Sequence, residues 1–118
     1  MNNEIKLNKR QEETLKNIEK QIELMGGYNE DDWQFLYDMK EQAFQMASLA
    51  KKSFRMALET LADISAESAE KVNATMINED LRKSMKDLNK EEKKLNQARK
   101  FESKINHLVL QQFEKWGK

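Results

Sequence analysis

Residues 25–32 read MGGYNEDD, and they contain the one glycine pair of the chain. The remaining glycine, Gly117, lies next to the last residue, and the sequence has no proline. Because glycine and proline mark most tight turns, and sheet proteins need many such turns, this distribution predicts an all-α fold. We expect a first helix to end at the glycine pair, with Gly26 in the left-handed conformation that is common after helices.

The residues after the glycine pair predict a second helix at about 30–74. Asn29 or Asp31 can cap it, and the acidic residues 30–32 favour the positive end of the helix dipole. At 100° per residue its apolar arc covers about 200°, so this helix should be flanked on two sides. The arc contains Trp33, Leu36, Tyr37, Met39, Ala43, Phe44, Met46, Ala47, Ala50, Phe54, Ala57, Leu58 and Leu61.

The residues before the glycine pair predict a shorter first helix at about 4–25, followed by a turn at 26–29. Leu15, Ile18 and Ile22 are spaced by three and four residues, which places them on one side of this helix. The apolar stripe fades before Leu15, so we expect the start of the helix to fray.

A third helix is expected at about 79–116, after a turn or kink at 73–79. Asn78 followed by Glu79 is typical of a new helix start, and an earlier break near 63–65 is the alternative, which would give four helices. Apolar residues of the third helix follow a seven-residue repeat, as in a coiled coil. They are Leu81, Leu88, Leu95, Val109 and Trp116, and the seam is interrupted at Ser84, Glu91 and Glu102.

The helix lengths predict a single domain, 1–118, in which the second and third helices form a long antiparallel hairpin. The first helix covers only the end near the glycine pair, where we expect a three-helix bundle with an aromatic core of Trp33, Tyr37 and Phe44 beside residues 101–116. The rest should be a coiled-coil-like stalk, completed by oligomerisation as a homodimer or by another protein. The candidate interface residues are Met46, Phe54, Leu58, Leu61, Ile64, Val72, Leu81, Met85 and Leu88.

The composition excludes several classes of protein. The absence of cysteine excludes disulfides, thiol catalysis and zinc sites that need thiolates. No apolar run approaches the roughly 20 residues of a membrane span, and the first residues lack the apolar core of a signal peptide. We therefore expect a cytoplasmic protein. The many Lys, Glu and Asn residues suggest a bacterial or phage gene.

Charge is unevenly distributed along a chain whose net charge is zero. Residues 1–81 contain 10 Lys/Arg and 16 Asp/Glu, whereas residues 82–118 contain 11 and 5. We interpret this as charge complementarity between helices, within or between subunits. The alternative is a basic surface that contacts nucleic acid nonspecifically. Its candidate residues are Arg82, Lys83, Lys86, Lys90, Lys93, Lys94 and Lys100.

No residue pattern indicates an active site, a cofactor site or a metal site. His107, the single histidine, lacks the Glu-x-x-His pattern of a helical di-metal site. The acidic residues 30–32 lack the spacing and the glycine of a calcium loop, and residues 26–27 lack the strand and flanking pattern of a phosphate-binding loop. We therefore expect neither enzyme activity nor a cofactor.

The sequence accordingly predicts a non-catalytic protein–protein interaction module, such as an adaptor, an inhibitor or an assembly factor, that acts through helix packing. One alternative is an amphipathic coat, in which the apolar arc of the second helix lies on a membrane or granule surface. A second alternative is a nucleic-acid-associated accessory protein that uses the basic third helix.

Overall fold

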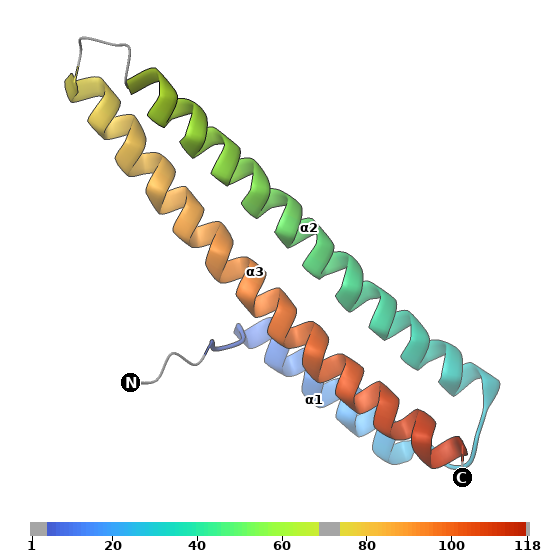
Figure 1. The fold of residues 1–118 in the computed structure, drawn as a ribbon. Helices are drawn as coiled ribbons and strands as arrows, with labels where there is room; N and C mark the ends of the chain where they lie inside the picture. The colour runs from blue at the N-terminus through green and yellow to red at the C-terminus, as the bar shows by residue number, and fades with distance from the viewer. Residues whose placement is uncertain (1–4, 69–73, 118) are drawn as a thin grey trace. The chain divides into compact units, whose positions relative to one another are not determined.

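The structure, a computed structural model, describes the backbone of residues 5–68 and 74–117 and the side chains of 5–67 and 79–117. These residues form three helices and no strand, which confirms the predicted all-α fold (Figure 1). The helices are α1 (Lys9–Leu24), α2 (Glu30–Ser68) and α3 (Ala74–Gly117).

The chain forms two compact units, and each contains part of α2 paired with part of α3. Unit 1 consists of residues 1–47 and 97–118, and unit 2 consists of residues 48–96. Unit 1 is a three-helix bundle that includes α1, whereas unit 2 is a two-helix hairpin. The predicted arrangement of a short helix with a long antiparallel hairpin is therefore confirmed.

The start of α1 is fixed by a capping box rather than frayed. Asn8 Oδ1 accepts a hydrogen bond from Gln11 N at 2.8 Å, and Gln11 Oε1 accepts one from Asn8 N at 3.0 Å. These bonds satisfy two of the backbone donors that a helix start leaves free. The polar residues that weaken the apolar stripe thus define the helix boundary at Lys9, later than the predicted start near residue 4.

The end of α1 does not use a left-handed glycine. Met25 N donates to Ile22 O at 3.0 Å, and the chain continues in an extended conformation, with φ −76° and ψ 138° at Met25. The prediction for Gly26 is wrong, because no glycine among the described residues has a positive φ. The helix stops because Met25 leaves the helical region one residue before the glycine pair.

The boundaries of the longer helices follow their caps only in part. Asn29 Oδ1 accepts from Asp31 N at 2.8 Å, so Asn29 is the cap of α2. The helix is continuous through residues 63–65, which excludes the predicted alternative of an early break.

The third helix, α3, begins at Ala74 rather than near residue 79. Asn78, the predicted cap, lies inside this helix, because an asparagine in a helix costs less than about 1 kcal/mol relative to alanine. Residue 73, the remaining position of the predicted turn, lies with residues 69–72 outside the described part of the chain.

The core of unit 1 is mostly aliphatic, and Phe101 is the aromatic residue of its buried cluster. α1 lies parallel to α3, because Gln97 Nε2 donates to Lys6 O at 2.9 Å and Trp116 Nε1 donates to Gly26 O at 3.0 Å (Figure 1). The buried cluster consists of Leu15, Ile18, Leu36, Ala43, Phe101, Ile105 and Val109. Burying a large side chain of this kind contributes about 1.5–3 kcal/mol, which explains why the short α1 is held in place.

The predicted aromatic core is wrong for Tyr37 and Phe44. Trp33 stacks on Phe113 with ring centroids 5.7 Å apart, but Tyr37 is 39% exposed and Phe44 is 56% exposed. Tyr37 and Phe44 lie about 160° and about 140° around α2 from Met39, which packs against the core beside α1. The single short helix covers one flank of the apolar arc and leaves the aromatic flank in solvent.

Candidate interaction surface

In unit 2, α2 and α3 pack through a narrow seam of small and apolar side chains. Only Ser84 and Leu95 are buried among the described side chains of this unit. The remaining seam residues are half buried: Ala50, Phe54, Ala57, Leu61 and Ile64 from α2, and Leu81, Leu88 and Glu91 from α3. Two helices without a third therefore leave this unit thinly covered.

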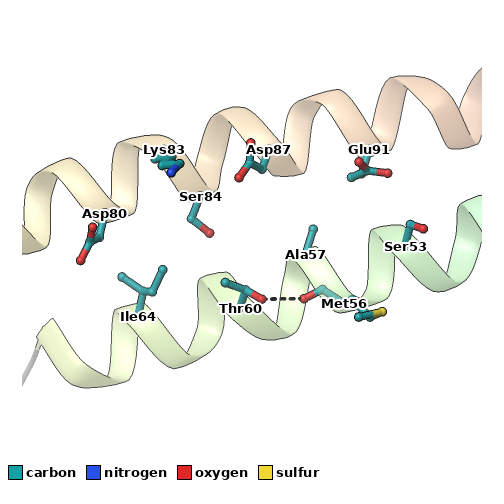
Figure 2. A pocket seen from close by; sticks show the side chains of 10 residues that line it. All are labelled: Ser53, Met56, Ala57, Thr60, Ile64, Asp80, Lys83, Ser84, Asp87 and Glu91. Atoms are coloured by element: carbon teal, nitrogen blue, oxygen red, sulfur yellow. Dashed lines mark hydrogen bonds between the residues drawn. The ribbon is translucent and has the colours of Figure 1, made fainter.

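A groove of about 470 Å³ runs along one flank of this seam. Its lining, which we call the acidic groove, is Ser53, Met56, Ala57, Thr60, Ile64, Asp80, Lys83, Ser84, Asp87 and Glu91 (Figure 2). In Figure 2, Ala57 and Ser84 point toward the facing helix, and Thr60 donates a hydrogen bond to Met56 O at 3.0 Å. Small side chains on the floor thus leave a hollow with carboxylates along its α3 edge.

The charge in the acidic groove is predominantly negative. Asp80, Asp87 and Glu91 contribute three carboxylates, and Lys83 contributes one ammonium group. Glu91 is also approached by Lys94 at 3.7 Å, one turn further along α3. The two side chains are 55% and 25% exposed, and a solvent-accessible pair of this kind contributes at most about 1 kcal/mol, so a closer cation can replace Lys94.

Large apolar side chains are exposed on both flanks of the hairpin. Met56 is 60% exposed at the acidic groove, and Leu49, 65% exposed, lies seven residues before it on the same side of α2. Leu58 and Met85 are 43% and 55% exposed. Each follows a seam residue by one position, which places both on the flank opposite the groove in an antiparallel pair.

The structure distributes the predicted interface residues over three environments. Leu58 and Met85 are exposed, and Met46 belongs to unit 1, where it lines a cavity with Thr14 and Ile18 of α1. Val72 lies outside the described residues. The others are half buried in the seam of unit 2: Phe54, Leu61, Ile64, Leu81 and Leu88.

The predicted basic face is divided among different contacts. Lys100 Nζ donates to Ile5 O within unit 1, Lys94 approaches Glu91, and Lys83 lines the acidic groove. A shallow hollow beside the groove is lined by Glu79 together with cations. Those cations are Arg82, Lys83 and Lys86. Carboxylates therefore interrupt the positive surface, unlike the uniform stripe of cations that is typical of DNA binding.

Sequence reasoning missed the carboxylates of the groove. Asp80 and Asp87 each precede a residue of the seven-residue repeat, so the repeat itself could have placed them on one flank. Ser84 and Glu91 interrupt the predicted seam, and both face α2 in unit 2. A polar residue at a seam position was the available signal for a hollow rather than a packed core.

His107 lies in a separate hollow of unit 1 with Leu15, Glu19 and Lys104. In the part of the chain that the structure describes, no three His, Asp or Glu side chains are arranged to hold a metal ion. Over the same residues, none of the helices has an apolar segment of the length that crossing a bilayer requires.

The acidic groove and the exposed residues opposite it are thus the features of unit 2 that can contact another helix. Comparison of the chain with protein-family models, with curated proteins and with solved structures found no match.

Proposed function

We propose that the chain is a non-catalytic protein–protein interaction module that associates through the helical hairpin of unit 2. The observation that supports this is the exposure of Leu49, Met56, Leu58 and Met85 on a hairpin that buries only two of its described side chains. Apolar surface removed from water contributes about 25 cal/mol per Å², so covering these residues with further helices is favourable.

A second hairpin is the simplest cover in this proposal. Two helical hairpins together make a four-helix bundle, in which each helix has two neighbours. We place the protein in the cytoplasm in this proposal, because a chain without cysteine has no disulfide that a reducing environment could break. Its role there would be that of an adaptor, an inhibitor or an assembly factor.

Light scattering across micromolar concentrations tests the proposal. We expect an assembly heavier than the 14.0 kDa monomer, and we expect Leu58→Ser to reduce its mass. The matched control is Leu24→Ser, because Leu24 is 81% exposed in unit 1 and outside the proposed surface. A monomer at all concentrations would exclude self-association, and equal effects of the two variants would exclude unit 2 as the surface.

A pull-down from the native host, read by mass spectrometry, tests whether another protein provides the cover. Proteins that bind the wild type and are lost with Leu58→Ser would support a heteromeric role. If self-association is absent and every captured protein binds both variants equally, the proposed function is wrong.

A further inference from the structure

We propose that unit 2 binds a second copy of the chain head to tail, with one flank of its hairpin in the acidic groove of the next copy. The inference rests on the proposed function and specifies its geometry. The docking flank, which we call the cationic flank, carries Lys51, Arg55, Leu58 and Met85.

The cationic flank follows from the register of the seam. Lys51 and Leu58 each follow a seam alanine by one residue, and Met85 follows Ser84 in the same way. Arg55 lies one turn after Lys51, and all of these side chains are exposed. Residues one position after the seam lie on the same side of both helices in an antiparallel pair. The flank thus combines apolar side chains with cations.

The two surfaces are complementary in charge. The acidic groove contains three carboxylates and one ammonium group. The cationic flank contains the cations Lys51 and Arg55, and Glu92, seven residues after Met85, adds one carboxylate on the same side. Net negative charge therefore meets net positive charge, and such complementarity selects partner and register.

The spacing of the charges also agrees. Asp87 and Glu91 are four residues apart on α3, and Lys51 and Arg55 are four residues apart on α2. Each interval is one helical turn, about 6 Å along the axis. Two cations on one helix can therefore face two carboxylates on the other, while Leu58 approaches the apolar side of Met56.

The surfaces lie on opposite flanks of one hairpin, so a single copy cannot satisfy both by itself. Contacts between different surfaces of identical chains are heterologous, and they continue into a ring or an open filament rather than stopping at a symmetric dimer. Association can therefore continue beyond a four-helix bundle. An open assembly keeps a free groove on the copy at one end and a free flank on the copy at the other.

Two substitutions separate this geometry from a symmetric dimer. Met56→Lys places a cation in the groove, and Leu58→Gln removes the apolar side chain from the cationic flank without adding charge. Both positions are exposed, so the helix should tolerate each change. For each variant alone, the dissociation constant of self-association should rise at least about tenfold. Leu110→Lys, at a residue 52% exposed in unit 1, is the matched control and should associate like the wild type.

Mixing the two variants gives the decisive result. The intact flank of Met56→Lys can bind the intact groove of Leu58→Gln, whereas the altered groove repels the cations of the flank and the altered flank lacks its apolar contact. Light scattering of the equimolar mixture should show a species of twice 14.0 kDa and nothing larger. Circular dichroism of each variant confirms that the helices remain folded.

Electrostatic complementarity is tested by reversing charges. Asp87→Lys should weaken association of the full chain about fivefold, and adding Arg55→Glu in the same chain should restore it. If the wild type associates but the two variants do not form a dimer on mixing, the head-to-tail geometry is wrong while the proposed function stands. If the wild type stays monomeric, this inference fails together with self-association.

Discussion

Trp116 Nε1 donates a hydrogen bond of 3.0 Å to the carbonyl oxygen of Gly26. The bond joins the last turn of α3 to the loop between α1 and α2. Tyr28 packs edge-on against the same indole, with ring centroids 5.7 Å apart. One side chain therefore holds the loop that sets the direction in which α1 returns along the bundle.

Trp116→Phe should lower the free energy of unfolding by about 0.5–1.5 kcal/mol, since it removes this donor and keeps an aromatic ring. Urea denaturation measures the change. Trp33→Phe is the control, because it retains the stack on Phe113 and should cost less. Equal losses for the two variants would show that the bond to Gly26 contributes nothing.

Asn8→Ala should destabilise the protein by about 1 kcal/mol, because the side chain that accepts from Gln11 N is lost. Asn17, exposed in the middle of α1, provides the control. Asn17→Ala should be neutral or slightly stabilising, as alanine is the better helix former. The midpoint of denaturation distinguishes the two, and a stable Asn8→Ala variant would contradict the capping box.

Gly26→Ala should stabilise the protein by about 0.4–1 kcal/mol. Gly26 has no positive φ, and a Cβ built there meets nothing within 4 Å. Alanine then restricts the unfolded chain without straining the folded one. Destabilisation in thermal unfolding would instead indicate that the loop needs the freedom of glycine.

Leu36→Ala and Leu88→Ala should differ in cost because their burial differs. Leu36 is fully buried in unit 1, so its truncation should cost about 3 kcal/mol or more. Leu88 is half buried in unit 2, and we expect about 1–2 kcal/mol in the monomer. Hydrogen exchange should agree, with amides of 48–67 exchanging faster than those of 101–112. Equal protection of both segments would contradict the thin cover of unit 2.

Asn106→Leu should raise the free energy of unfolding by about 1 kcal/mol. Asn106 Oδ1 is buried without a hydrogen-bond partner among the described residues, and an unsatisfied buried acceptor costs about 1–3 kcal/mol. Asn106→Asp, which buries a charge at the same place, should be destabilising. A loss of stability with leucine would show that the amide forms a bond in solution, for example to water.

Much of the fold follows from residue spacing. The glycine pair divides α1 from α2, and the repeat that contains Leu81 and Leu88 identifies the seam of the hairpin. Periodicity could not show which flank of the broad apolar arc α1 covers, because both flanks are apolar. Met39 packs beside α1, whereas Phe44 remains exposed although it is also a large apolar residue of the arc.

The groove was harder to anticipate for a related reason. A seven-residue repeat describes what lies between two helices, whereas Asp80 and Asp87 lie beside that line. Their role depends on how much of the flank a third helix covers, and α1 belongs to unit 1 alone. The conformation of Gly26 could not be predicted from its residue type either, because α1 already ends at Met25, which is extended.

The contacts of α1 have a consequence for synthesis on the ribosome. The hydrogen bonds that join α1 and its flanking residues to α3 connect residues 90 to 95 positions apart, whereas the groove of unit 2 brings Ile64 and Asp80 together. A 16-residue helix is marginal alone, and the core that buries α1 is complete only once α3 is present. The nascent hairpin of unit 2 closes earlier, and neighbouring chains on one messenger could meet through it before unit 1 exists.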